Sequence, residues 1–195
     1  WDFEPKEREQ LRPGHRMQLQ LSNNSILQAL QQADVLISPT AWQKSRFPIE
    51  YQQRIEVVPD GIDTDFYRPP QQRQQEVPLV TYVSRTMEPF RGFEKVMEAF
   101  SFLQREHKTC RMILVGQTDR YEYSCTPPHG KTYKEIYETQ FPLDPKRTQF
   151  TGWVGEKQLL QILQASTAHV YLTRPFVLSW SFLQAMATGC AVVAS

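Results

Sequence analysis

The sequence predicts an α/β protein in which a doubly wound parallel sheet is preceded by a partial second domain. From residue 79 onward, short apolar runs typical of buried parallel strands alternate with stretches of helical periodicity. Strands and helices in this alternation indicate right-handed βαβ crossovers and therefore a parallel sheet. Residues 64–78 are rich in proline and glutamine and poor in apolar side chains, which indicates a linker. At 195 residues, the chain is long enough for one large domain or two small ones.

The part before the linker is expected to hold few regular elements. Residues 1–22 are polar and weakly patterned, so we predict no regular structure for them. A helix is predicted from residue 24, where apolar side chains begin to recur at helical spacing. Short strands are predicted at residues 35–38 and 55–58, with a short helix between them.

Beyond the linker, the expected strands and helices alternate. The predicted strands cover residues 79–83, 112–115, 148–151 and 169–172. The predicted helices cover residues 93–106, 134–139 and 156–165. A long irregular segment is expected over residues 116–131.

The last stretch, residues 175–195, is predicted to complete the sheet with a loop, a helix and a strand. Ser179 is a candidate N-cap of this helix, and Gly189 ends it. The helix is expected to be buried because much of it is apolar, at Trp180, Leu183, Ala185 and Met186. Residues 191–194 are an apolar run short enough for a central strand. Since unpaired N–H groups lie at the start of such a helix, the preceding loop is a candidate site for an anionic ligand.

The composition argues against several classes of function. The 22 basic and 21 acidic residues leave a net charge of +1, which favours neither a nucleic-acid partner nor an anionic membrane surface. The cysteines, Cys110, Cys125 and Cys190, are odd in number and widely spaced, as is typical of small core residues in a reducing compartment. No leader or bilayer-spanning apolar run is evident, so a cytoplasmic location is expected. The four histidines are scattered, so we expect neither a metal site nor a catalytic triad.

Two arginines, Arg85 and Arg91, stand on either side of a proline-containing turn that ends at Gly92 before a predicted helix. Planar guanidinium groups match phosphate oxygens, so the pair is a candidate for binding a pyrophosphate. The alternative is that both arginines pair with Glu88 and Glu94 on a solvated surface, where each pair contributes little.

Other motifs are weaker by themselves. The turn at residues 152–155 could meet a flat ligand, but by itself it favours an ordinary strand-to-helix connection. Asp60 and Gly61 form the signature of a tight turn, and Trp180 and Phe182 are expected to lie in the core. No glycine-rich fingerprint follows a strand, which disfavours a Rossmann enzyme of the NAD type.

Several of these segments form a set that is more specific than any one of them. They are Pro59-Asp60-Gly61-Ile62-Asp63, residues 85–92, Leu114-Val115-Gly116, Phe150-Thr151-Gly152-Trp153-Val154 and Gln184-Ala185-Met186-Ala187-Thr188-Gly189. In this order, the set resembles the retaining, nucleotide-sugar-dependent glycosyltransferases with two Rossmann-like domains, the GT-B architecture of glycosyltransferase group 1. The resemblance covers roughly residues 24–195. It implies that residues 1–63 are the C-terminal tail of the acceptor-side domain, 64–78 a linker, and 79–195 a nucleotide-sugar-binding domain truncated at its C-terminus.

The resemblance also implies roles for the matching residues. Arg85 and Arg91 would hold the donor diphosphate and neutralise the charge that develops on the leaving group. Val154 would lie in the loop that meets the nucleobase, and Gly61 in an interdomain turn near the phosphates. The remaining residues implied in nucleotide-sugar binding are Gly116 and the residues of the loop that presents N–H groups to phosphate and sugar, Val177, Leu178 and Ser179.

Two positions depart from the family motif, which has two glutamates where this chain has Phe176 and Gln184. The second glutamate ordinarily accepts hydrogen bonds from ribose hydroxyls. Gln184 keeps one carbonyl acceptor but loses the charge and the second acceptor oxygen. The Phe176 side chain can make no polar contact, so Arg174 or Thr173 is a candidate to replace part of the role of the family's first glutamate. Both departures put the affinity for the donor, or its identity, in question.

The function implied by the resemblance is transfer of a sugar from a nucleoside-diphosphate sugar to a saccharide or lipid-linked acceptor, with retention of configuration. No cofactor and no metal is expected, because the arginines supply the positive charge. A lipid-linked acceptor would imply peripheral association of the full-length enzyme with a membrane. Because the family's proteins extend further at both ends, we expect a fragment that binds donor without completing the reaction. The alternative is a non-catalytic Rossmann-like module that binds a nucleotide or a partner.

Overall fold

The computed structural model describes residues 13–72, 77–174 and 178–195. Contacts divide the chain into two compact units, Trp1–Asp60 and Gly61–Ser195. Each unit has an apolar core of its own among the described residues.

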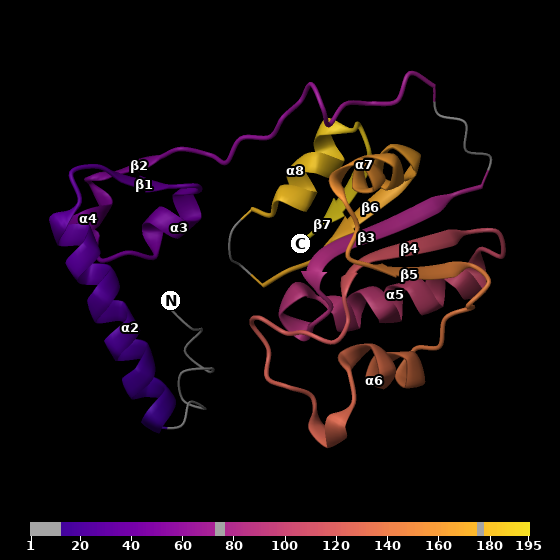
Figure 1. The fold of residues 1–195 in the computed structure, drawn as a ribbon, viewed down its shortest axis with the longest axis horizontal. Helices are drawn as coiled ribbons and strands as arrows, with labels where there is room; N and C mark the ends of the chain where they lie inside the picture. The colour runs from indigo at the N-terminus through magenta and orange to yellow at the C-terminus, as the bar shows by residue number, and fades with distance from the viewer. Residues whose placement is uncertain (1–12, 73–76, 175–177) are drawn as a thin grey trace. The chain divides into compact units, whose positions relative to one another are not determined.

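The first unit contains a long helix and a small parallel sheet (Figure 1). Helix α2 spans Pro13–Gln32, and strand β1 at Leu36–Ser38 pairs in parallel with β2 at Ile55–Val57. Between the strands lie the short helices α3, Ala41–Ser45, and α4, Ile49–Gln52. The strands and the short helical segment therefore follow the predicted pattern.

Helix α2 begins eleven residues earlier than predicted, so the expectation of irregular structure is wrong for residues 13–22. Most side chains described in this part of the helix are exposed. Its glutamines, leucines and methionine are strong helix formers and need no buried stripe to be helical. The buried end of α2 lies near its C-terminus, where Leu30 packs with Leu36 and Ile55. Apolar periodicity marks only this buried end.

In the second unit, the described residues form a five-stranded sheet made entirely of parallel pairs. The strands are β3 (Leu79–Thr86), β4 (Arg111–Gln117), β5 (Thr148–Gly152), β6 (Ala168–Tyr171) and β7 (Ala191–Ala194). The helices are α5 (Phe93–Glu106), α6 (Tyr133–Gln140), α7 (Glu156–Ala165) and α8 (Trp180–Ala187), with 3-10 turns η1 (Pro89–Arg91) and η2 (Pro128–Gly130). The strand order is β5-β4-β3-β6-β7. The predicted fold class, an α/β doubly wound parallel sheet, is confirmed.

Helices cover both faces of this sheet (Figure 1). Tyr82 of β3 belongs to the larger core cluster together with Phe93 of α5 and Tyr137 of α6. Its neighbour Val83 packs on the opposite face with Leu163 of α7 and Ala185 of α8. Successive side chains of a strand point to opposite faces, so β3 contributes to both cores.

Two predictions about the last stretch are wrong. Strand β7 is an edge strand rather than a central one, and most of its residues are exposed. Helix α8 is only partly buried, because Ala185 is fully buried whereas Trp180 and Met186 are 64% and 44% exposed. Trp180 is therefore not a core residue. An apolar run of four residues has the same pattern at the edge of a sheet as at its centre, so the sequence does not separate the two.

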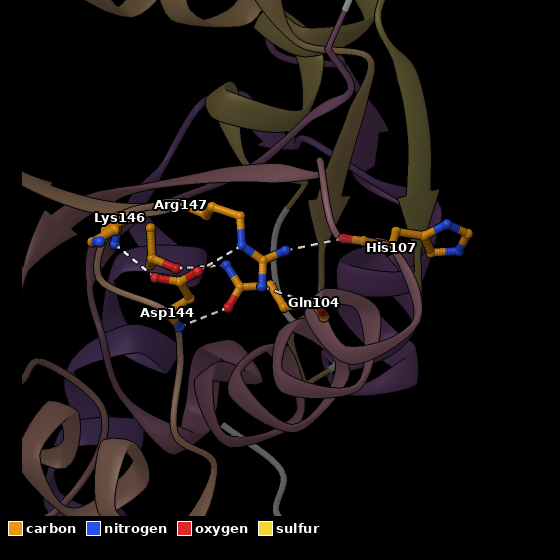
Figure 2. A network of polar contacts seen from close by, with 6 residues as sticks. Gln104, His107, Asp144, Lys146 and Arg147 are labelled. Carbon is orange, nitrogen blue, oxygen red and sulfur yellow. Dashed lines mark hydrogen bonds and ion pairs between the residues drawn. The ribbon is translucent and has the colours of Figure 1, made fainter.

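A polar network connects the end of α5 to the start of β5 (Figure 2). The Arg147 guanidinium donates from Nε to Asp144 Oδ2 at 2.8 Å, from Nη1 to the His107 carbonyl at 3.0 Å and from Nη2 to the Gln104 carbonyl at 3.2 Å. Gln104 Oε1 accepts from the Asp144 N–H at 2.8 Å, and its Nε2 donates to Thr148 Oγ1 at 2.8 Å. Carbonyls at the end of a helix lack intrahelical partners. Arg147 therefore caps α5 and fixes the loop that leads into β5.

Candidate functional site

The connections of the sheet change direction between β3 and β6. Strand β3 leads through α5 to β4 on one side, whereas its neighbour β6 leads through α8 to β7 on the other. In open α/β sheets, ligands bind at the carboxyl ends of the strands beside such a divergence. The loops that follow β3 and β6 meet there, because the Arg174 N–H donates to the Phe90 carbonyl at 3.1 Å.

Arg85 lies at the carboxyl end of β3 and Arg91 in the turn that follows it, and residues 85–92 are called the arginine loop below. It ends at Gly92, whose φ is +69° and where a Cβ would lie 2.6 Å from Leu172 Cβ. Behind the loop, Gly116 at the end of β4 has a φ of +146°, and a Cβ there would lie 1.9 Å from the Ser84 carbonyl oxygen. Residues other than glycine rarely adopt either of these φ angles. The predicted binding residue Gly116 therefore has a packing reason to be glycine, since it lets β4 approach the start of the loop.

Arg85 lies at the end of β3 with its side chain 64% exposed. Its Nη1 donates to Glu122 Oε1 at 3.2 Å, so its partner is Glu122 and not Glu88 or Glu94 as the alternative prediction had it. Glu88 is fully buried. An exposed ion pair contributes only about 0.2–1 kcal/mol. The Arg85 guanidinium can therefore exchange this carboxylate for another anion at little cost.

Arg91 closes the turn η1 and is half-buried. Its Cζ lies 4.9 Å from the centroid of the Tyr123 ring, a distance typical of a cation–π contact. The Tyr82 hydroxyl donates to the Arg91 carbonyl at 2.9 Å, which holds the backbone of the turn against the core. Burial raises the pKa of Tyr82 well above its ordinary value, so this hydroxyl keeps its proton.

Of the loop before α8, Leu178 and Ser179 are described, whereas the predicted site residues Phe176 and Val177 lie outside the described residues. The Ser179 N–H donates to the Tyr171 hydroxyl oxygen at 3.3 Å. Ser179 is the N-cap residue of α8, but its hydroxyl bonds to the Ser181 hydroxyl at 2.9 Å and makes no capping bond. The predicted N-cap position of Ser179 is therefore confirmed, but its side chain makes no capping bond.

Strand β6 connects the arginine loop to the start of α8. Burial raises the pKa of the Tyr171 hydroxyl, while the bond from the Ser179 N–H and the positive charge of Arg91 act in the opposite direction. Printed contacts relate the two loops through β6, since the Phe90 carbonyl of the arginine loop accepts from the Arg174 N–H just after β6, and the Ser179 N–H donates to the Tyr171 hydroxyl at the end of β6.

The other predicted residues are placed less closely together. Val154 follows β5 and is half-buried, next to Trp153, which is 66% exposed. Val154 lies at the same carboxyl edge of the sheet as the arginine loop, but it follows β5, which is the strand furthest from β7. Gln184 is half-buried in α8. Gly61 is exposed at the start of the second unit, and a Cβ there would meet nothing within 4 Å, so the structure does not connect it to the other candidates.

Sequence reasoning missed Glu88, Glu122 and Tyr123 as parts of this site. Glu122 and Tyr123 lie in the segment expected to be irregular, where no periodicity marks any residue. The available signal was Glu88, a glutamate inside the arginine motif and directly after the apolar Met87. Because a glutamate is rarely buried without hydrogen-bond donors, its position predicts a partner segment but not which one.

The described part of the chain holds neither a cluster of metal-ligating side chains nor a helix able to span a membrane. There, His, Cys, Asp and Glu side chains nowhere gather in threes as a metal site would require. No helix in the same ranges combines the length and the apolar character needed to cross a bilayer.

Two models of protein families match this chain. Residues 77–195 match the model described as Glycosyl transferases group 1, and residues 1–67 match that described as Glycosyl transferase family 4 group. The first match covers more than half of the chain. The chain therefore belongs to the glycosyl transferases group 1 family. No curated protein sequence matches it.

Solved structures with the same fold are glycosyltransferase domains of the GT-B class. The C-terminal domain of a glycosyl transferase group 1 family protein (LpcC) from Francisella tularensis is 21% identical with a TM-score of 0.55, over 69% of this chain and 70% of that one. Sucrose-phosphate synthase from Thermosynechococcus elongatus is 19% identical with a TM-score of 0.67, over 85% of this chain and 41% of that one. A third structure is a TarM mutant from S. aureus in complex with fondaparinux, alpha-GlcNAc-glycerol and UDP. It is 15% identical with a TM-score of 0.67, over 89% of this chain and 32% of that one. At these identities the likeness shows the fold alone, and the chain spans less than half of the last two proteins.

Proposed function

We propose that this chain is the donor-binding part of a retaining glycosyltransferase, which transfers a sugar from a nucleoside-diphosphate sugar to a saccharide or lipid-linked acceptor. The observation that carries the proposal is that the arginine loop, through Phe90, contacts Arg174 after β6, and that Ser179 contacts Tyr171 of β6, where β3 and β6 diverge. A cation and the start of a helix at this point of an open sheet suit a phosphate-bearing ligand. Family membership adds that the ligand carries a sugar.

In this proposal, the arginines act on the leaving group. The diphosphate of the bound donor already carries a negative charge on each phosphate, and departure of the sugar adds another on the leaving oxygen; guanidinium groups stabilise such charge best in a site shielded from water. Arg85 is exposed and releases Glu122 easily, whereas Arg91 is half-buried against Tyr123. Arg91 would therefore hold the diphosphate in place, and Arg85 would close onto it. Positive charge from two arginines replaces the charge that a metal supplies elsewhere.

The start of α8 would supply the remaining phosphate contacts. The Ser179 side chain makes no capping bond, and the N–H groups in the first turn of a helix attract anions. Gln184, further along the same helix, would accept a hydrogen bond from the ribose through its amide oxygen. The UDP held by the TarM mutant, which has the same fold, is the kind of nucleotide proposed.

The proposal is tested by calorimetry of the 195-residue chain with UDP-, GDP- and ADP-sugars. One of these should bind, and Arg85→Ala and Arg91→Ala should each weaken binding about tenfold or more, as expected for charge-assisted bonds. Arg111→Ala is the matched control, because Arg111 is an exposed arginine at the opposite, amino end of β4. Absence of binding to all three sugars would favour the non-catalytic module. Retention is tested separately, by the anomeric configuration of a transfer product relative to the donor.

A further inference from the structure

A buried carboxylate lies inside the arginine loop. Glu88 is fully buried and accepts a hydrogen bond from the Thr86 hydroxyl. It also accepts the backbone N–H groups of Glu122 at 3.3 Å, Tyr123 at 3.0 Å and Ser124 at 2.7 Å. A buried charge persists only when donors compensate for its lost hydration. Glu88 therefore fixes the backbone of residues 122–124 to the loop that carries both arginines.

The segment fixed in this way contacts each arginine through adjacent side chains. Glu122 accepts from Arg85 Nη1 at 3.2 Å. The next residue, Tyr123, lies with its ring 4.9 Å from Arg91 Cζ and stacks on Phe90 at 5.1 Å between ring centroids. One short segment thus sets the position of both guanidinium groups, and Glu88 sets the position of the segment.

We propose that Glu88 is a positioning residue for diphosphate binding: it orders residues 122–124 so that Tyr123 supports Arg91 and Glu122 limits the reach of Arg85. The inference rests on the proposed function, in which these arginines bind the diphosphate. Arginine side chains lose much rotational freedom when they bind a ligand, and a prearranged guanidinium loses less. Glu88 strengthens donor binding without touching the donor.

The geometry separates this role from a purely structural one. Of the printed bonds to the Glu88 carboxylate, one comes from Thr86 at the end of β3 and the others come from the loop at residues 122–124. The sheet itself is held by the parallel pairing of β3 with β4 and β6. Loss of the carboxylate should therefore release the segment before it releases the fold.

The first test is a double-mutant cycle on UDP affinity. Glu88→Gln keeps the size of the side chain but replaces one acceptor oxygen by a donor, so we expect about three- to tenfold weaker binding. In the Arg91→Ala background, the same change should alter affinity by a smaller factor, because one of the two guanidinium groups that Glu88 positions is gone. Glu98→Gln is the matched control, since Glu98 is an exposed glutamate of α5 paired with Lys95. Equal effects of Glu88→Gln in both backgrounds would overturn the proposal.

The second test needs no ligand and so separates this inference from the proposed function. Phenylglyoxal modifies arginines that are free to move, and mass spectrometry follows the rate at each site. Glu88→Gln should raise the rate at Arg91 at least about threefold, as expected when a cation–π contact and its support are lost, and leave Arg111 unchanged. If Glu88→Gln does not fold, Thr86→Val removes one donor to the carboxylate and should shift the rate in the same direction. Unchanged rates at Arg91 in the folded variant would refute the positioning role even if UDP binds.

Discussion

The guanidinium of Arg91 lies over the ring of Tyr123, with Cζ 4.9 Å from the ring centroid. Cation–π contacts of this kind contribute about 0.5–1 kcal/mol at partly exposed sites. Tyr123→Leu should therefore weaken UDP binding about two- to fivefold. Tyr123→Phe keeps the ring and should bind as the unmodified chain does. Calorimetry of both variants checks this, and equal losses for Phe and Leu would assign the effect to the hydroxyl, which both variants lack.

Glu122 competes with the proposed ligand for Arg85. Because the pair is exposed and contributes about 0.2–1 kcal/mol, Glu122→Gln should tighten UDP binding by up to about fivefold. The gain should shrink as salt concentration rises. Glu138→Gln, which removes a carboxylate from the Lys134 pair on α6, should leave the affinity unchanged. Weaker binding of the Glu122 variant would show that its carboxylate assists the ligand.

Gly116 tolerates no side chain in the present backbone. A Cβ there would lie 1.9 Å from the Ser84 carbonyl oxygen, and the φ of +146° is unfavourable to any other residue. Gly116→Ala should lower the free energy of unfolding by about 2–4 kcal/mol. At Gly155 a Cβ would meet nothing within 4 Å, so Gly155→Ala should lose no more than about 1 kcal/mol. Urea denaturation measures both, and equal losses would contradict the close approach of β4 to Ser84.

His169 makes stability depend on pH. Burial lowers the pKa of this histidine from 6.5 to about 4, and its Nδ1 lies 3.0 Å from Thr81 Oγ1. Between these two values the unfolded chain takes up a proton that the folded chain does not, so stability falls as pH falls from 6.5 to about 4. The slope approaches about 1.4 kcal/mol per pH unit. His169→Gln should abolish this part of the acid sensitivity, as urea denaturation at pH 7, 5.5 and 4.5 would reveal; parallel losses in both proteins would exclude His169 as the cause.

Arg147 stabilises the second unit through the end of α5. Arg147→Met removes the bonds to Asp144 and to the carbonyls of Gln104 and His107, and should cost about 1–3 kcal/mol of unfolding free energy. Lys146→Met is the matched control, because the recorded bond of Lys146 to Asp144 comes from its backbone N–H. Thermal unfolding followed by circular dichroism compares the two. Equal midpoints would mean that the network in Figure 2 does not stabilise the fold.

The parallel α/β architecture could be predicted from the sequence, because the alternation of buried runs with amphipathic helices is a local pattern. Helices α5 and α7 have the predicted bounds, Phe93–Glu106 and Glu156–Ala165. It also singled out Arg85, Arg91 and the loop before α8, because motif residues at the carboxyl ends of parallel strands must share one edge.

The neighbours of Arg85, Arg91 and the loop before α8 depend on how the elements pack in the tertiary structure. Glu88 reaches residues 122–124, more than thirty positions away, through side chain to backbone bonds that no local pattern encodes. Whether the last strand is central or at the edge, and whether Trp180 is covered, likewise depends on which elements pack beside them. Periodicity reports which side of an element is apolar, whereas the identity of its neighbour is a property of the assembled sheet.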